Sequence, residues 1–414
     1  MAGYVPRLAD GQLASALRRV GAVVIEGPKA CGKTETALQT AASVVRMDTD
    51  PQVATMMEVD PGLVLGGDSP RLIDEWQVHP SIWDQVRRRV DESREVGQFL
   101  LTGSTAPAEE QSRHSGAGRF ARLRMRTMSL LETEDSSGKA SLSAICRGEP
   151  VAVGPGPLPD VRALLERVAR GGWPADLGLS VEDALANRAD YVETIAAVDI
   201  RTPDGTRRNP QRVLALLKAL ARSNGTEVSL QTLAADAGIT RDAVRDYLDA
   251  LARIFITEDQ PAWAGHLRSS ATLRSTPKRH LADPSLAVAA LGASPNSLLR
   301  DLEYAGQLVE SQAVHDLRIY TAAERANITH GRTSRDQEVD AVVEYPDGRW
   351  ALIEVKLGAR REVVDAAADS LRAFADQISL RGRTAPQLIV LTGTGPAMTR
   401  ADGVHQVSLT TLGP

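Results

Sequence analysis

The strongest constraint on the fold is a strand, a glycine-bounded loop and a helix that follow one another near the start of the chain. A β-branched run at 23–25 precedes the loop, and the segment 33–42 after it is compatible with a helix. The loop fits the G-x-x-x-x-G-K-[ST] phosphate-binding pattern. Backbone N–H groups of such a loop converge on phosphate oxygens. A nucleotide site is therefore predicted at Gly27, Pro28, Lys29, Ala30, Cys31, Gly32, Lys33 and Thr34.

Four side chains have predicted roles at the nucleotide phosphates. Lys33 should reach the β and γ phosphates, and the Thr34 hydroxyl should bind Mg²⁺. Asp74 and Glu75 follow an apolar strand, and ligands of open α/β sheets bind at the carboxyl ends of strands. Asp74 would hold the magnesium ion through water, and Glu75 would polarise the attacking water as a general base.

One serine and one arginine are candidates for contacts with the γ-phosphate. Ser104 follows the apolar strand 99–102 and is a candidate sensor of that phosphate, although an ordinary turn residue fits equally well. Arg119 lies beside a glycine on a predicted loop and is a candidate arginine finger. Acting in trans, it requires an oligomer with the site at a subunit boundary. The following Arg122, Arg124 and Arg126 alternate with apolar residues and fit the solvated face of a strand.

Composition limits the class of protein. A length of 414 residues predicts two or three domains, and 43% apolar with 24% charged residues is typical of a folded soluble chain. The formal net charge of −5 argues against a chain that attracts nucleic acid over its whole surface. Two cysteines, Cys31 and Cys146, fit a reducing compartment. With neither a signal peptide nor an apolar run of about 18 residues, we expect a cytoplasmic protein without membrane contact.

A Gly-Pro-rich stretch at 154–159 marks the clearest break in composition, and an α-rich segment follows it. Helices are predicted at 160–170, 181–198, 211–223, 229–237 and 240–254. The last three, followed by Phe-Ile-Thr-Glu at 255–258, have the order of a winged helix. In its recognition helix, Arg241 and Arg245 are accompanied by aspartates that would repel phosphates. A connector or interaction module is favoured over DNA reading, and both stay open.

The last third of the chain predicts a hairpin that brings carboxylates together. A predicted helix at 296–316 carries Glu310, and apolar strands flank a Pro-Asp-Gly turn at 346–348. Pairing counted outward from this turn places Asp340 directly opposite Glu354 on one face of the hairpin.

These carboxylates predict a divalent-metal site. Oxygen ligands from Asp340, Glu354 and Glu310 select Mg²⁺ or Mn²⁺, and Lys356 shares the face of Glu354. Such a site can orient a water for phosphodiester cleavage, with Glu354 and Lys356 as catalytic residues. The elements around the hairpin have the αβββαβ order of the restriction-endonuclease-like fold. The alternative is an inactivated relic or a salt-bridged hairpin.

The order of these motifs resembles a widespread bacterial and archaeal family of AAA-type ATP-binding proteins whose C-terminal half is a domain of unknown function. The similar motifs are the phosphate-binding loop at 27–34, Ile-Asp-Glu-Trp-Gln at 73–77, Thr-Gly-Ser at 102–104, Gly-Ala-Gly-Arg at 116–119, Gly-Gly-Trp-Pro at 171–174, and Glu-Val-Asp and Ile-Glu-Val-Lys near the end. The resemblance implies an ATPase domain, a winged-helix-like middle and a nuclease-like C-terminal domain. It implies no particular substrate.

The expected fold class is α/β, with a P-loop AAA-like ATPase domain at 1–153, a helical and winged-helix-like segment at 154–265 and a restriction-endonuclease-like domain at 266–414. The main hypothesis is an ATP-hydrolysing protein whose nucleotide state controls a metal-dependent nuclease acting on DNA. ATP and Mg²⁺ are the expected cofactors, with Mn²⁺ possible at the C-terminal site. The alternative is a regulatory switch or scaffold whose C-terminal domain is inactive and binds a partner. A regulator that reads DNA through the winged helix is a third option, and a homo-oligomer or a partner protein is expected.

Overall fold

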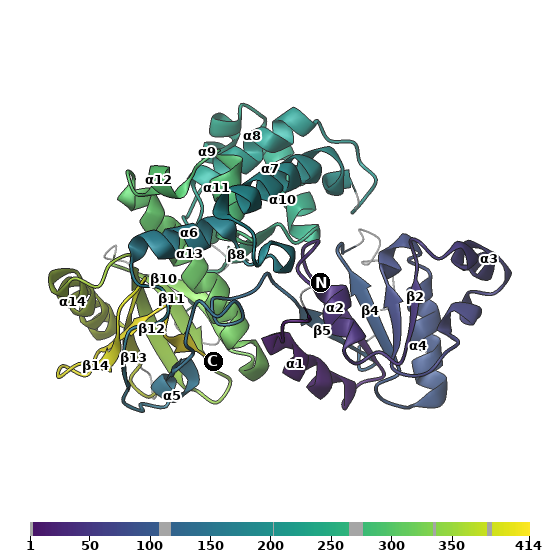
Figure 1. Ribbon diagram of the computed structural model, residues 1–414, viewed down its shortest axis with the longest axis horizontal. Coiled ribbons are helices and arrows are strands. Elements are labelled where there is room, and N and C mark those ends of the chain that lie inside the picture. The colour runs from purple at the N-terminus through teal and green to yellow at the C-terminus, as the bar shows by residue number, and fades with distance from the viewer. Residues whose placement is uncertain (1–2, 107–116, 202, 265–275, 334–336, 379–382) are drawn as a thin grey trace.

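The computed structural model of the protein describes residues 3–106, 117–201, 203–264, 276–333, 337–378 and 383–414 (Figure 1). A parallel sheet lies at one end of the molecule, a mixed sheet lies at the other, and a layer of helices extends along one side. No described helix is both long and apolar enough to cross a membrane.

The N-terminal domain is built on a five-stranded parallel sheet in the order β2-β3-β4-β1-β5. Val23 and Ile25 pack toward α1 and α2, whereas Ala22 and Val24 pack toward α3 and α4. Helices therefore cover both faces, as an α/β chain requires. The elements are α1 (Leu8–Leu17), β1 (Ala22–Glu26), α2 (Lys33–Leu38), β2 (Ser43–Arg46), α3 (Pro51–Val59), η1 (Pro61–Leu65), β3 (Arg71–Asp74), η2 (Trp76–Val78), α4 (Ile82–Ser93), β4 (Phe99–Gly103) and β5 (Phe120–Arg124).

The middle of the chain is helical. Its elements are α6 (Val161–Arg170), η4 (Pro174–Asp176), α7 (Val181–Ala197), η5 (Asp199–Arg201), α8 (Pro210–Arg222), α9 (Leu230–Ala237), α10 (Arg241–Arg253), α11 (Pro284–Ala290) and α12 (Pro295–Leu298). Short polar side chains cap most of these helices; Asp160, Ser180 and Asn209 each accept a hydrogen bond from a backbone N–H of the first turn. Beside the helices, β8 (Thr257–Gln260) pairs antiparallel with β9 (Lys278–Leu281).

The C-terminal domain contains a seven-stranded mixed sheet in the order β10-β11-β12-β13-β15-β14-β7. Helix α13 (Leu302–Tyr320) packs on one face and α14 (Arg361–Gln377) on the other. The strands are β10 (Asn327–Arg332), β11 (Glu338–Glu344), β12 (Trp350–Lys356), β13 (Gln387–Thr392), β14 (Ala397–Thr399), β15 (His405–Ser408) and β7 (Ala152–Val153), and η7 (Ala322–Glu324) follows α13. The order α13-β10-β11-β12-α14-β13 is the αβββαβ order predicted from the sequence.

The hairpin register is confirmed. Strands β11 and β12 pair antiparallel from Ala341 opposite Ile353 to Glu344 opposite Trp350. Asp340 and Glu354 come one step further along the same register. The backbone N–H of Val355 donates to Asp340 Oδ2 at 2.8 Å, so the two candidate residues lie at adjacent positions of the sheet.

Three predicted boundaries need correction. Residues 140–153 belong to the C-terminal sheets, because β7 pairs with β14 and β6 (Ala140–Ser141) pairs with β16 (Leu412–Gly413), with α5 (Leu142–Cys146) between them. The helical layer extends past residue 265, since α11 packs on α6, α7 and α8. The predicted helix at 296–316 is two helices. The break lies at Asp301, whose side chain caps α13 by accepting from the Tyr304 N–H.

Candidate nucleotide site and acidic cluster

The predicted phosphate-binding loop lies between β1 and α2, at the carboxyl edge of the parallel sheet. Gly32 precedes α2 with a φ of +101°, a left-handed conformation that favours glycine. A Cβ atom on Gly27 would lie 2.3 Å from the carbonyl oxygen of Met125. Both glycines of the pattern are therefore required by the backbone itself.

The Lys33 side chain is folded onto the loop. Its Nζ atom lies 3.0 Å from the Gly27 carbonyl oxygen and 2.8 Å from the Pro28 carbonyl oxygen, and the residue is 5% exposed. An ammonium group has three donors. These two carbonyls take two of them among the described contacts, which leaves the third to meet a phosphate oxygen.

Asp74 lies at the end of β3 and meets two hydroxyl groups. Its Oδ1 atom accepts from the Thr34 hydroxyl at 2.8 Å and from the Thr102 hydroxyl. A carboxylate and a hydroxyl side by side are the hard oxygen donors that Mg²⁺ takes together with water and phosphate oxygens, so the residues fit this ion. The prediction brought Thr34 and Asp74 together but missed Thr102, whose position at the end of the neighbouring strand β4 was the available signal.

Glu75 and Ser104 also meet at this edge. The Ser104 Oγ atom lies 3.4 Å from Glu75 Oε2, which also accepts from the Gln77 side chain. Glu75 has a φ of +53°, which is uncommon outside glycine and concentrates at functional sites. Glu75 lies directly beside Asp74, where the sequence places a general base.

Arg119 lies at the opposite end of the sheet from the loop. It directly precedes β5, whose first residue pairs with Ala22 at the start of β1, whereas the loop follows the end of β1. Its Nε atom forms an ion pair with Asp91 at 2.7 Å. Arg119 therefore does not reach the loop of its own chain.

The helical layer contacts the phosphate-binding loop directly. Lys29 Nζ forms an ion pair with Asp199 of η5 at 2.6 Å, and Pro174 lies 3.5 Å from the position of a Cβ atom on Gly32. Trp173 is 1% exposed and packs edge-on against Tyr191 of α7 at 5.1 Å. The Gly-Gly-Trp-Pro motif at 171–174 thus packs the helical layer against the loop, a role that the sequence did not indicate.

Arg7 links the phosphate-binding loop to the segment after β5. Its guanidinium donates to the Cys31 carbonyl at 2.8 Å, to the Arg126 carbonyl at 2.9 Å and to Glu132 Oε1 at 3.0 Å. Glu132 Oε2 in turn accepts from the N–H and the hydroxyl of Ser129. Although burial alone raises it, Arg7 and the backbone donors hold the pKa of Glu132 below its ordinary value.

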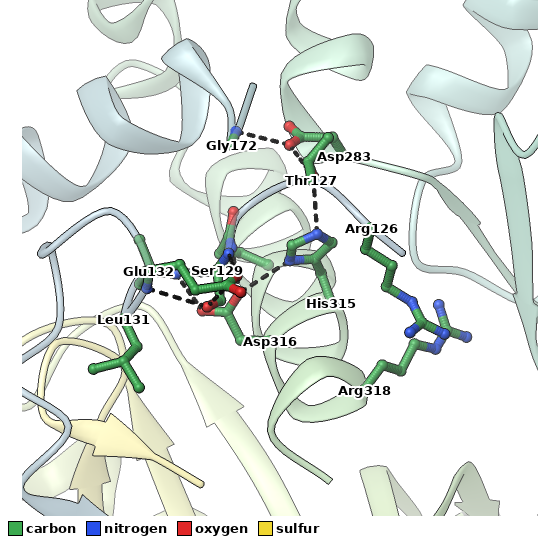
Figure 2. Close-up of polar contacts among 12 residues, drawn as sticks. Arg126, Thr127, Ser129, Leu131, Glu132, Gly172, Asp283, His315, Asp316 and Arg318 are labelled. Carbon is green, nitrogen blue, oxygen red and sulfur yellow. Dashed lines mark hydrogen bonds and ion pairs between the residues drawn. The ribbon is translucent and has the colours of Figure 1, made fainter. Parts of the chain in front are cut away.

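The same segment is bound to α13 of the C-terminal domain, as Figure 2 shows. The Leu130 N–H donates to Asp316 Oδ2 at 3.3 Å, and Asp316 Oδ1 lies 2.9 Å from His315 Nδ1. His315 Nε2 lies 2.9 Å from the Thr127 hydroxyl, which also contacts Asp283 at 2.7 Å. The Gly172 N–H donates to Asp283 at 2.9 Å. The buried network consists of Arg7, Thr127, Ser129, Leu130, Glu132, Gly172, Asp283, His315 and Asp316.

The contacts of Thr127, His315 and Asp316 resemble those of a catalytic triad, with a nucleophile, a base and an acid that orients the base. However, these side chains are buried and a substrate cannot reach them. Thr127 and Asp316 are 0% exposed and His315 is 5% exposed. The Thr127 hydroxyl donates its one proton to Asp283, so the His315 ring has no proton to take from it. This part of the buried network is structural.

A lysine lies at the centre of the carboxylates predicted to bind metal. Lys278 Nζ is 2.7 Å from Glu310 Oε1, 2.9 Å from Glu338 Oε1 and 3.4 Å from Asp340 Oδ1, and its side chain is 5% exposed. With Glu354, these carboxylates line a cavity of about 360 Å³. We call Glu310, Glu338, Asp340 and Glu354 the acidic cluster.

The carboxylates of the acidic cluster differ in how they are paired. Lys356 pairs with Glu354 Oε1 at 2.7 Å, whereas Glu354 Oε2 is buried without a hydrogen-bond partner among the described residues. Burial and Asp340 raise the pKa of Glu354 to about 7 and that of Glu310 to about 8. Although burial opposes it, the surrounding carboxylates raise the pKa of Lys278, so its ammonium stays charged.

Among the residues that the structure describes, no three or more His, Cys, Asp and Glu side chains form a group that could hold a metal ion. Glu310 and Asp340 thus both contact Lys278, and the Glu354–Lys356 pair lies beside them. Lys278 was missed because it lies 32 residues before Glu310, on a strand that no motif marked.

Three family matches cover most of the chain. Residues 19–134 match an AAA domain, residues 161–297 match a domain of unknown function (DUF8612), and residues 305–412 match a second domain of unknown function (DUF4143). This is an AAA-type ATP-binding protein with a C-terminal domain of unknown function. The match to an AAA domain supports ATP binding and hydrolysis by this protein.

The solved structures include a similar protein, the Walker-type ATPase PABY2304 of Pyrococcus abyssi. The similarity covers 68% of this AAA-type protein and 94% of that chain, with 11% sequence identity and a TM-score of 0.43. No curated protein matches the chain.

Proposed function

We propose that this AAA-type protein is a switch in which ATP binding and hydrolysis change the state of the C-terminal domain. The observation that carries the proposal is Arg7, which donates both to the Cys31 carbonyl of the loop and to Glu132 of the buried network. A bound nucleotide alters the electrostatic field at the loop, and Arg7 is a buried cation that also contacts the segment bound to α13. ATP occupancy and the packing of α13 are thereby coupled, and by linkage each affects the other equally.

At the loop, the proposed roles follow the contacts. Lys33 binds the β and γ phosphates, Thr34 and Asp74 hold Mg²⁺, Glu75 is the general base, and Ser104 senses the γ-phosphate. The Thr34 hydroxyl lies 2.8 Å from Asp74 Oδ1, which supports a shared role at Mg²⁺. The Ser104 hydroxyl lies 3.4 Å from Glu75 Oε2, which supports a place for both at the γ-phosphate. For Arg119 only a role in trans is compatible with its place at the far end of β5.

The test of this part is nucleotide binding and ATP turnover in Lys33→Ala and Glu75→Gln. Lys33→Ala should lose binding, because the phosphates lose their cation. Glu75→Gln should keep binding and lose turnover by roughly a hundredfold or more, as expected for removal of a general base. Turnover unchanged in Glu75→Gln would remove Glu75 from the mechanism.

For the C-terminal domain we favour a partner-binding module over a metal-dependent nuclease acting on DNA. Lys278 supplies the acidic cluster with a tethered cation at hydrogen-bond distance from Glu310 and Glu338, where a nuclease would hold its metal. Displacing this ammonium would leave it buried without its partners, which is unfavourable. The observation that favours the nuclease is the Glu354 oxygen, which has no hydrogen-bond partner in the described part of the chain.

The two functions are separated by a cleavage assay on plasmid and single-stranded DNA with Mg²⁺ or Mn²⁺, with and without ATP. The switch predicts no cleavage by the wild type while ATP hydrolysis stays intact. Cleavage that disappears in Glu354→Ala and depends on ATP or on Lys33 would instead establish the ATP-controlled nuclease.

A further inference from the structure

A cavity of about 410 Å³ lies where β5, β8 and the C-terminal end of α13 meet. Two carboxylates, Glu258 and Asp259, and five arginines line it, and the arginines are Arg122, Arg124, Arg126, Arg318 and Arg325. The lining carries three positive charges in excess, in a chain whose formal net charge is −5. We call this the arginine cavity.

Both carboxylates of the arginine cavity are already engaged. Glu258 accepts two hydrogen bonds from Arg126, at 2.9 Å and 2.6 Å, and lies 3.5 Å from Arg318. Figure 2 shows the side chains of Arg126 and Arg318 extending toward one another. Asp259 forms its ion pair, at 2.8 Å, with Arg279. The direct contacts of these two carboxylates therefore go to Arg126, Arg318 and Arg279.

Arg124 and Arg325 are the arginines of this cavity that no described carboxylate binds directly, although Glu258 and Glu26 lie close enough to Arg124 to raise its pKa. Among the described residues, neither side chain makes a hydrogen bond or an ion pair. The Arg124 guanidinium instead lies over the Phe255 ring, 4.0 Å from its centroid, and burial lowers the pKa of Arg124 to about 10. Stacking uses the face of the guanidinium and leaves its N–H groups, which lie in the plane, free to donate.

We propose that the arginine cavity binds a phosphate-bearing anion, with Arg124 and Arg325 as its ligands. A planar guanidinium matches a phosphate with two parallel N–H···O bonds, and a half-buried arginine with no acid in direct contact is a site where an anion offsets a desolvated charge. The arginine cavity is separate from the P-loop. None of the loop residues 27–34 lines it, although Arg124 pairs in the sheet with Glu26, the residue directly before the loop.

The first experiment is a calorimetric titration of pyrophosphate into the full-length protein carrying Lys33→Ala, which removes phosphate binding at the P-loop. Pyrophosphate should bind, and adding Arg124→Gln should weaken it about tenfold or more, the value of a charge-assisted bidentate interaction. Arg325→Gln is the second variant, because Arg325 is exposed and its replacement leaves the core intact. Arg361→Gln is the matched control, since this exposed arginine begins α14 and does not line the arginine cavity.

The second experiment distinguishes the source of the phosphate. A labelled single-stranded oligonucleotide is titrated at several salt concentrations into the same variants. If the phosphate belongs to a nucleic-acid backbone, the oligonucleotide binds, and Arg124→Gln lowers the salt dependence by about 0.7 for each phosphate that the variant no longer neutralises. If only pyrophosphate binds with this dependence on Arg124 and Arg325, the ligand is a free phosphate compound.

Two results would overturn the proposal. One is the absence of binding by both probes. The other is equal affinity in Arg124→Gln, Arg325→Gln and Arg361→Gln, which would mean that the arginine cavity does not hold the anion. A failure of the ATP switch would leave these outcomes unchanged, because the titrations are made in the Lys33→Ala background.

Discussion

Two buried cations, Arg7 and Lys278, hold carboxylates of the candidate sites in place. Arg7 is 7% exposed and contacts Glu132, whereas Lys278 is 4% exposed and contacts the acidic cluster. Removing one partner of a buried ion pair leaves an uncompensated charge, and this is more damaging than removing both. Replacing Arg7 or Lys278 should therefore act through the carboxylates that each of them contacts.

Arg7→Leu should destabilise the protein by about 3–5 kcal/mol, because it leaves Glu132 buried and charged. The measurement is urea-induced unfolding of the full-length chain followed by fluorescence. The double variant Arg7→Leu with Glu132→Leu should recover part of the loss. Equal destabilisation in the single and double variants would show that the ion pair does not matter.

The pH dependence of stability should carry a contribution from Glu132. Its folded-state pKa is lowered below the ordinary 4.5, so the stabilisation is fully present above about pH 4.5 and is lost as the pH falls through the folded-state value. Glu132→Gln should remove this part of the acid sensitivity. Thermal melts between neutral pH and about pH 3 measure it, and identical pH profiles for the two proteins would contradict the assignment.

Lys278→Ala should convert the acidic cluster into a metal site. Without the ammonium, Glu310, Glu338 and Asp340 lose their shared cation, and a divalent cation can take its place. Mn²⁺ titration followed by electron paramagnetic resonance should show an affinity at least about tenfold higher than in the wild type. Adding Asp340→Asn should abolish the gain. A wild type that binds Mn²⁺ as tightly as Lys278→Ala would support the nuclease instead.

At the scale of elements, the predictable features were those determined by local chemistry. The Pro-Asp-Gly turn set the register of β11 and β12, and a motif with its flanking residues predicted the strand, loop and helix around the P-loop. The break before α13 depends on one capping aspartate, Asp301, inside an otherwise helical pattern. Lys278 and Asp199 were not predictable, because tertiary packing alone brings β9 to β11 and η5 to the loop.

The contact between η5 and the loop gives a prediction for nucleotide affinity. Asp199 is a carboxylate close to a site that binds phosphates, and it engages Lys29 through an ion pair of 2.6 Å. Asp199→Asn should therefore tighten ATP binding by roughly two- to fivefold, since it removes a like charge and frees a cation. Binding of a fluorescent ATP analogue measures this. Weaker binding would mean that Asp199 mainly holds η5 in place.

At the scale of the whole molecule, the three matched regions and the two large sheets are joined by contacts between residues far apart in the sequence. Residues 140–153 cross from the end of the AAA match at 134 to the C-terminal sheets before the chain enters the helical layer at 161. We predicted that this crossing belongs to the ATPase domain, because the break in composition comes only after it, at 154–159. The prediction was wrong because a break in composition shows where the chain changes in character, and it does not show where a segment packs. The crossing ties the domains together along the chain and in space, which supports communication between them.

The central claim is that nucleotide occupancy of the P-loop reaches the C-terminal domain through Arg7. Amide hydrogen exchange of α13 tests it most directly. Exchange is measured with and without a non-hydrolysable ATP analogue in the wild type, in Arg7→Lys and in Lys33→Ala. Arg7→Lys keeps the positive charge but loses the several N–H donors of the guanidinium. We expect the analogue to change exchange in α13 of the wild type, and Arg7→Lys to bind the analogue without this change. Exchange in α13 that is the same with and without bound nucleotide would contradict the claim.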